Sequence, residues 1–133
     1  PKARGALEST LAAPGLYDVV IAHLAARGLP VDEAVLNRDV TLPYDPQPSV
    51  EAAWLEVYRD HEQYFDLYEL GEKLVDIEDA LQQWRFKHMA TVRRIIGDKR
   101  GTGGSSGVSF LKKAIEIEFF PELIRVRTEI GAT

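Results

Sequence analysis

One histidine in the sequence lies where its side chain can do more than pack. His88 comes four residues after Trp84 and four before Val92, within a run of apolar residues spaced by three and four. A histidine on such a helical face needs partners for both ring nitrogens. It is either a core histidine bonded to a neighbouring carbonyl or hydroxyl, or an axial ligand to a haem iron in an apolar slot. Spacing alone favours the first interpretation.

A glycine-rich segment after this position offers a second candidate site. Residues 101–107 are Gly-Thr-Gly-Gly-Ser-Ser-Gly. Glycines let the backbone approach a ligand closely, and the Thr102 and Ser105 hydroxyls suit a carboxylate or phosphate. No Gly-Lys-Ser/Thr follows and a helix rather than a strand precedes, which excludes a Walker loop and a dinucleotide fingerprint. The segment is either a flexible surface loop or a lid over a small polar ligand.

Charged side chains near His88 have more ordinary interpretations. Asp76, Glu78 and Asp79 are expected to form a solvated face, because no histidines with metal-ligand spacing accompany them. Arg85 and Lys87 lie close to His88 and are candidates to pair with haem propionates, although most charges on a helix are simply solvated.

The helix that carries His88 is the most clearly predicted element. No proline occurs from His61 to Ile96, and Gly97 ends the segment. Gly71 weakens the helix, which either continues through it or is split or bent there. The apolar residues form one helical stripe. The stripe consists of Leu67, Leu70, Leu74, Ile77, Leu81, Trp84, His88, Val92 and Ile95. An unbroken helix would be roughly 54 Å long, whereas a domain of this size has a radius of gyration of about 14 Å. We therefore expect part of the stripe to pack against another chain or a missing segment.

Shorter helices are expected on either side of a proline-rich connector. Residues 6–12 form a short helical stretch, and a helix with Pro14 in its first turn runs to Gly28. Residues 29–48 contain four prolines and are expected to be extended. Ser49 is the predicted cap of the next helix. A last helix opens after Phe119-Phe120, at the following proline.

The composition supports one folded all-α domain. The 133 residues are 45% hydrophobic and 28% charged, and no segment alternates with strand period. We expect residues 1–133 to form a helical bundle with one long central helix. The net charge of −5 argues against a nucleic-acid partner, and the absence of cysteine excludes disulfides and thiolate sites. No apolar run reaches the roughly 20 residues of a membrane span, and no signal-type run follows the N-terminus. A cytoplasmic protein without a membrane association is the expectation.

Several motifs of the sequence form a recognisable combination. They are Gln83-Trp84-Arg85-Phe86-Lys87-His88, Ile95-Ile96-Gly97, the run from Lys99 to Val108, Phe119-Phe120-Pro121-Glu122-Leu123 and Val126-Arg127-Thr128. Together they resemble the C-terminal, haem-ligand half of tryptophan 2,3-dioxygenases. Residues 13–18, 68–70 and 72–76 are also similar to this family, so that the resemblance covers nearly the whole chain and is densest from about Tyr58 to Thr128. The glycine-rich string after a helix with Trp-Arg-Phe-x-His is specific only as a combination.

The resemblance implies roles for individual residues. His88 matches the proximal ligand of the iron of haem b, with Trp84 beside it at the cofactor. Thr102 matches the threonine that contacts the amino-acid end of the substrate. The loop that closes over the substrate would contain Gly101, Gly103, Gly104 and Ser105.

The resemblance also implies a reaction and an assembly. Members of the family cleave the indole C2–C3 bond of L-tryptophan with O2 to give N-formylkynurenine, and they are typically homotetramers. The family's N-terminal half, which supplies the distal side of the site, has no counterpart here, so the isolated chain is expected to be incomplete. It would be completed by that half or by another chain. Two alternatives remain: a related haem-dependent aromatic oxygenase of secondary metabolism, and a non-catalytic helical module for haem binding or assembly.

Overall fold

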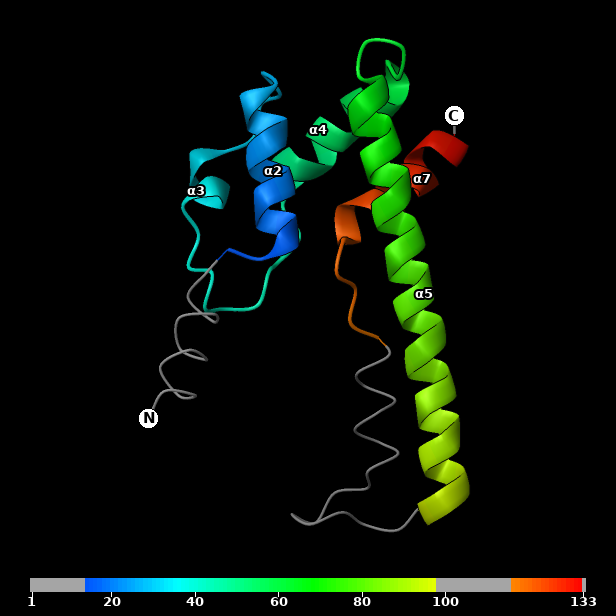
Figure 1. Cartoon of the computed structure of the whole chain (residues 1–133). Coiled ribbons are helices and arrows are strands. Elements are labelled where there is room, and N and C mark those ends of the chain that lie inside the picture. The colour runs from blue at the N-terminus through cyan, green and yellow to red at the C-terminus, as the bar shows by residue number, and fades with distance from the viewer. Residues whose placement is uncertain (1–13, 98–115, 133) are drawn as a thin grey trace. The chain divides into compact units, whose positions relative to one another are not determined.

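The computed structural model describes residues 14–97 and 116–132, and in these residues helices joined by turns and irregular connectors make up the fold (Figure 1). The five helices in these residues are α2 (Leu16–Ala26), α3 (Glu33–Leu36), α4 (Pro48–Arg59), α5 (Phe65–Ile96) and α7 (Pro121–Ala132). No strand occurs among the described residues. The all-α prediction is therefore confirmed, as are the long helix and the last helix at Pro121. The helix expected over residues 6–12 lies outside the described residues.

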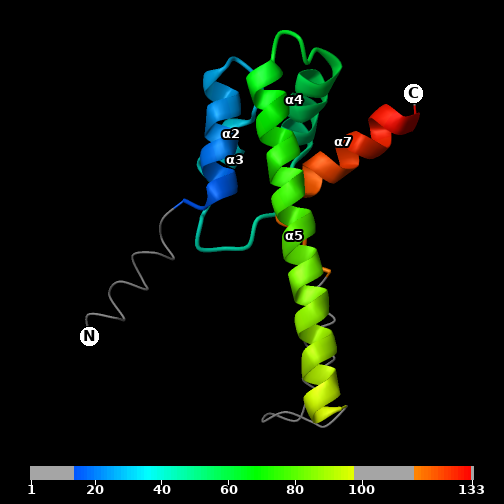
Figure 2. The ribbon, with the colours of Figure 1, turned by 45° about the vertical axis from the view of Figure 1, so that its right-hand side comes forward.

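The chain divides into two compact units that share α5. The first unit comprises Pro1–Gly71 and Phe120–Thr133, and the second comprises Glu72–Phe119. Helix α5 passes from the first unit into the second without a break, as two views of the ribbon show (Figure 1, Figure 2). The expectation of a single domain over residues 1–133 stays a prediction.

The start of α2 is fixed by an aspartate of its first turn. The Asp18 carboxylate accepts a hydrogen bond from the Gly15 N–H at 2.9 Å and two from the Arg38 guanidinium at 2.6 and 2.9 Å. Burial alone would raise the pKa of Asp18, but the hydrogen bonds from Arg38 and Gly15 outweigh it and lower that pKa. Pro14 precedes the helix and is not part of its first turn, so the predicted start is wrong by two residues.

The end of α2 forms the turn that its glycine predicts. Gly28 has a φ of +91°, a left-handed conformation that costs other residues energy. Its N–H donates to the Ala25 carbonyl at 3.0 Å, and the Leu29 N–H donates to the Leu24 carbonyl at 3.2 Å. These two bonds define a Schellman motif, which satisfies carbonyls that the helix itself leaves open.

The proline-rich connector contains a short helix that the sequence did not predict. Within residues 29–48, expected to be extended, α3 turns once and buries Val35, which is 6% exposed.

The predicted cap of α4 is also wrong. Pro48 occupies the first turn of α4, where its missing N–H costs nothing. The Ser49 hydroxyl instead accepts a hydrogen bond from the Asp32 N–H at 3.1 Å.

Gly71 does not split α5; it allows other side chains to approach the helix. A Cβ atom at this position would lie 2.9 Å from the Tyr58 hydroxyl, 3.0 Å from a ring carbon of Trp54 and 3.3 Å from a methyl of Leu123. A glycine within a helix costs about 1 kcal/mol relative to alanine. Close packing around the missing side chain offsets that cost, and α5 continues through Gly71 without interruption.

The first unit has an apolar core in which α7 packs against α4. Its side chains are almost completely removed from solvent. They are Ile21, Leu24, Val50, Trp54, Val57, Leu67, Leu123 and Val126. Burial of this kind contributes roughly 1.5–3 kcal/mol for each large side chain, so this core is what holds the short helices of the unit together.

A buried carboxylate connects separate segments of this unit. Glu122 of α7 is fully buried and accepts hydrogen bonds from the Tyr17 hydroxyl at 2.8 Å, the Gln47 N–H at 2.8 Å and the Tyr44 hydroxyl. The Trp54 indole N–H donates in turn to the Tyr17 oxygen at 3.1 Å. Burial, followed by the influence of the Glu122 carboxylate, raises the pKa of both tyrosines. Both hydroxyls therefore remain protonated donors to the carboxylate.

Candidate functional site

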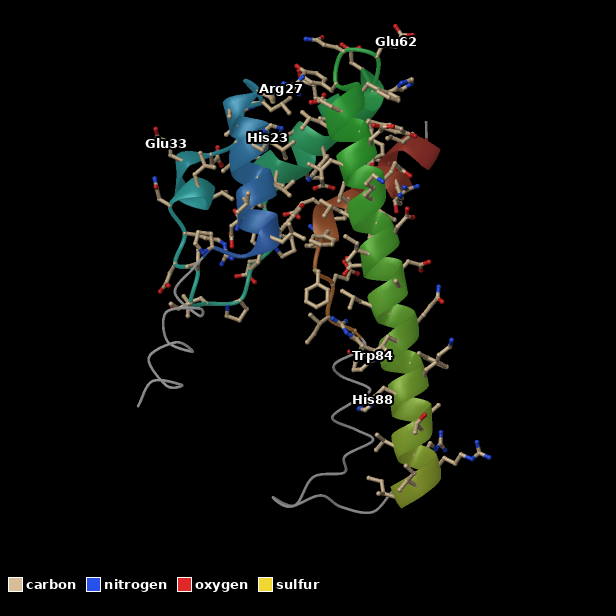
Figure 3. The ribbon with its side chains drawn as sticks, in the orientation of Figure 1. His23, Arg27, Glu33, Glu62, Trp84 and His88 are labelled. Atoms are coloured by element: carbon tan, nitrogen blue, oxygen red, sulfur yellow. The ribbon has the colours of Figure 1, made fainter. Side chains whose placement is uncertain are left out.

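His88 lies on an exposed part of α5, in the second unit. Its imidazole stacks on the Trp84 indole, with ring centroids 5.0 Å apart and planes 5° from parallel. Residues four apart are neighbours on a helix, and Figure 3 shows both side chains projecting from the same side of α5. No hydrogen bond joins the His88 ring to another described residue. The geometry thus does not favour the interpretation as a bonded core histidine, and the ring is accessible to a ligand.

Exposed apolar side chains surround His88 on the helix. Ile77 is 43% exposed, Leu81 37%, Trp84 61% and Ile95 76%. Residues seven apart lie within roughly 20° of each other around a helix axis, so Leu81 and Ile95 stand two turns before and after His88 on the same side. Contiguous exposed apolar surface of this kind generally marks a binding site or an interface. The expectation that part of the stripe packs against something else stays a prediction, but the surface that it requires is present.

The residues predicted to contact the substrate lie outside the described part of the chain. They are Gly101, Thr102, Gly103, Gly104 and Ser105. For this segment, the structure describes only the end of the preceding helix, α5. The helix ends at Gly97, whose φ is +63° and whose N–H donates to the Arg93 carbonyl at 2.8 Å. In the sequence, Gly101, the first of the predicted substrate contacts, comes four residues after this helix end.

Two charged residues of α5 have partners that the sequence did not indicate. Glu78 is only 6% exposed, and its carboxylate accepts a hydrogen bond from the Phe119 N–H at 2.6 Å. Arg85 donates to the Ile117 carbonyl at 2.9 Å, and its guanidinium lies 4.4 Å from the centroid of the Phe119 ring. The expectation of a solvated acidic face is therefore wrong for Glu78. The partner of Glu78 lies 41 residues away in the sequence, so no local pattern could have revealed it.

A protein-only metal site is not found in the described ranges. Nowhere in residues 14–97 and 116–132 do three His, Cys, Asp or Glu side chains meet so that they could hold an ion. A haem iron does not require such a group, because the porphyrin supplies most of its ligands and the protein can hold it through one imidazole. In the same ranges, none of the helices combines the length and the apolar character needed to cross a bilayer.

Comparison with known proteins decides the family. The sequence profile of tryptophan 2,3-dioxygenase matches residues 13–130. The chain belongs to the tryptophan 2,3-dioxygenase family. The resemblance inferred from the motifs around His88 is thereby confirmed, and it extends beyond those motifs to both units of the chain.

Curated tryptophan 2,3-dioxygenases of several bacteria are similar over nearly the whole chain. The protein of Shewanella woodyi is 62% identical over 124 residues, which are 93% of this chain and 43% of that protein. The protein of Bacillus thuringiensis is 58% identical over 130 residues, which are 98% and 47% respectively. That of Geobacillus thermodenitrificans is 59% identical over 120 residues, or 90% and 43%. The chain therefore spans less than half the length of these tryptophan 2,3-dioxygenases.

Proposed function

We propose that this chain supplies the haem-ligand half of a tryptophan 2,3-dioxygenase site. In the proposed reaction the indole C2–C3 bond of L-tryptophan breaks and each of the two carbons takes one atom of O2. The product is N-formylkynurenine, which contains both oxygen atoms, so no further reductant is consumed. The observation that carries the proposal is the accessible imidazole of His88 on the exposed apolar face of α5.

The surroundings of His88 fit a haem b group. A porphyrin is a flat apolar ring, and Leu81, Trp84 and Ile95 present apolar surface on the same part of α5. Iron ligation requires a neutral imidazole in a defined orientation. Stacking on Trp84 holds the plane of the His88 ring at 5° to the indole. When bound there, haem would supply the iron that activates O2.

The other contributions of this chain follow from its sequence. Thr102 would bind the amino-acid end of L-tryptophan, and the residues beside it would exclude water from the reacting atoms. These neighbours are Gly101, Gly103, Gly104 and Ser105. In this arrangement His88 would hold the haem iron, and the glycine-rich segment would bind the substrate.

The remaining half of the site must come from elsewhere. We propose that residues 1–133 act as the C-terminal part of a larger haem dioxygenase, completed by the N-terminal half or by another chain in a cytoplasmic homotetramer. The exposed apolar residues Ile77 and Ile95, at 43% and 76%, provide surface that such partners would cover. The proposal therefore includes that the isolated chain does not turn over L-tryptophan.

Substitution of His88 in the complete assembly tests the ligand. We expect His88→Ala to lose the Soret band and the bound haem of the parent and to form no N-formylkynurenine. In His88→Gly, free imidazole is expected to restore both the Soret band and part of the turnover, which separates lost ligation from lost folding. His23→Ala is the matched control, because His23 is also an exposed histidine on a helix.

Three other outcomes would each contradict a different part of the proposal. Unchanged haem content and Soret band in His88→Ala would overturn the ligand assignment. A parent assembly that binds haem through His88 without oxidising L-tryptophan would support the non-catalytic alternative. Oxidation of another aromatic substrate in preference to L-tryptophan would instead favour the related aromatic oxygenase.

A further inference from the structure

Helix α5 has a second exposed face besides the one that carries His88. Asp79, Phe86 and Arg93 are all exposed, and they follow one another at intervals of seven residues. Residues seven apart lie within roughly 20° of each other around a helix axis, so these three side chains share one side of α5. Phe86 is 60% exposed, although its ring is large and apolar. We call this surface the Phe86 face.

The Phe86 face points away from the candidate haem site. Two residues separate Phe86 from His88 along the helix, which places their side chains roughly 160° apart around the axis. A group bound to His88 therefore leaves Phe86 uncovered. An aromatic side chain surrounded by polar ones is the usual composition of the centre and rim of a protein interface.

Two local features indicate that the Phe86 face lacks a partner. A hollow with a volume of about 360 Å³ lies at Gln82, Gln83, Phe86 and Lys87. A cavity of roughly 150 Å³ already holds a benzene ring, so the hollow has room for a second aromatic side chain. The Gln82 Oε1 atom is buried and accepts no hydrogen bond from any residue that the structure describes. Buried acceptors in native proteins almost always have a donor.

Charges of opposite sign flank Phe86 at equal distances. Asp79 precedes it and Arg93 follows it by the same seven residues, or roughly 10 Å in each direction along the helix. Within residues 14–97 and 116–132, neither of these two side chains forms an ion pair. The pattern is self-complementary. When a second α5 lies antiparallel with its Phe86 opposite the first, each Asp79 comes opposite the Arg93 of the other copy.

We propose that the Phe86 face is an interface between two copies of this chain, which pair through antiparallel α5 helices. The twofold axis passes between the two Phe86 rings, and an Asp79–Arg93 ion pair lies on each side of it. In such an interface the same residues of both copies meet. A parallel pairing is excluded, because it would bring like charges together. The symmetry about Phe86 favours a second copy over an unrelated segment, for which equal spacing of opposite charges offers no advantage.

This inference goes beyond the proposed function. It assigns residues and a geometry to an association between copies, on a surface separate from the stripe around His88. It requires neither haem nor L-tryptophan, and its experiment uses neither. Failure of the His88 assignment and failure of this pairing are therefore separate results.

Charge reversal in the full 133-residue chain tests the pairing. We expect the parent to form dimers in sedimentation equilibrium, with a dissociation constant that rises with salt concentration because exposed ion pairs are screened. Asp79→Arg and Arg93→Asp should each raise that constant at least about tenfold, since each reversal makes two attractive contacts repulsive. The double variant restores opposite charges across the axis and should dimerise like the parent.

Glu69→Arg is the matched control. Glu69 is an exposed acid of the same helix, but it lies 17 residues before Phe86, whereas α5 ends ten residues after Phe86. No residue of the second α5 therefore stands opposite Glu69, and its reversal should change the dissociation constant by less than about twofold.

A cross-linking experiment locates the contact on the helix. The chain contains no cysteine, so Phe86→Cys introduces a single thiol that lies next to the twofold axis. A short bismaleimide should join two copies of Phe86→Cys far more efficiently than two copies of Glu69→Cys. Equal cross-linking of the two variants would contradict the pairing.

Other results would overturn the inference as well. A parent chain that remains monomeric throughout the micromolar range would show that the face does not bind a second copy. A dimer that neither single reversal weakens, or a double variant as weak as the single ones, would place the contact elsewhere. Protection of the Phe86→Cys thiol from alkylation only on addition of the N-terminal half of the Shewanella woodyi relative would assign the face to that half instead.

Discussion

The core of the first unit and the later part of α5, in the second unit, expose their apolar side chains to very different extents. In the first unit, Leu24, Trp54 and Leu123 are completely buried. Along the apolar stripe of α5, Leu67 and Leu74 are buried as well, whereas Trp84 and Ile95 further along are 61% and 76% exposed. One periodic pattern on α5 is thus covered near the start of the helix and open further along it.

This difference indicates where stability and function are located. A side chain in the closed core contributes to folding, because its removal from water occurs within the chain. A side chain on the open stripe contributes little until something covers it, and contiguous exposed apolar surface generally marks a binding site or an interface. His88 stands on the open stripe and Glu122 in the closed core, and we expect substitutions at these two positions to affect different properties.

The largest effect on stability is expected at the buried carboxylate of the first unit. Glu122→Ala would leave the Tyr17 and Tyr44 hydroxyls and the Gln47 N–H without their shared acceptor. Because each unsatisfied buried donor costs about 1–3 kcal/mol, we expect a loss of about 3–5 kcal/mol in the free energy of unfolding. Denaturant titration measures this loss. Glu56→Ala, at an exposed position of α4, serves as the control. A change below 1 kcal/mol at Glu122 would show that the network does not bear on stability.

A pair of alanine substitutions compares the closed core with the open stripe directly. Leu123 is fully buried and Ile95 is 76% exposed. Leu123→Ala should cost about 3 kcal/mol, from lost burial and the cavity left behind. Ile95→Ala should cost less than about 0.5 kcal/mol, yet weaken haem retention in the complete assembly. Thermal unfolding and haem content are the two measurements. Equal losses of stability would mean that the stripe is a core in the folded protein.

The sequence predicts those features of the fold and the candidate site that depend on residues close together in the chain. Periodicity and local turn chemistry predict α5, the end of α2 at Gly28 and the start of α7 at Pro121, because these features are determined within one or two turns. Motif resemblance singles out His88. Neither predicts which half of α5 is covered, since that depends on the packing of distant segments.

The buried polar contacts show the same limit more clearly. Glu122 bonds Tyr17 across 105 residues, and Glu78 bonds Phe119 across 41. In the sequence, both glutamates resemble their solvated neighbours. A carboxylate whose hydrogen-bond donors are distant in the sequence leaves no local sequence pattern, because the donors reach it only when the chain has folded. Gly71 is a similar case, since helix propensity describes its cost and not its packing.

A smaller effect is expected at Gly71, where two opposing contributions compete. Alanine improves helix propensity by about 1 kcal/mol. Its Cβ, however, would meet the Tyr58 hydroxyl at 2.9 Å and a Trp54 ring carbon at 3.0 Å, and overpacking typically costs about 1–3 kcal/mol. We therefore expect Gly71→Ala to destabilise the protein by about 1–2 kcal/mol. Gly71→Ala combined with Tyr58→Phe should recover part of this loss, because the closest atom is removed. A net stabilisation of the single variant would show that these neighbours yield easily.

The smallest effect should depend on pH and concerns the ion pair at the start of α2. Arg38 and Asp18 side chains are 20% and 15% exposed, and the pKa of Asp18 is lowered from its usual value of 3.8. A carboxyl with a lowered folded-state pKa stabilises the fold above its unfolded pKa, and this contribution disappears as the pH falls through the folded value. Asp18→Asn should therefore cost about 1 kcal/mol at neutral pH, and the difference from the parent should shrink below pH 3.8. Denaturant titrations at several pH values provide the comparison. A difference that grew on acidification would mean that Asp18 is held in its protonated form, contrary to the hydrogen bonds from Arg38 and Gly15.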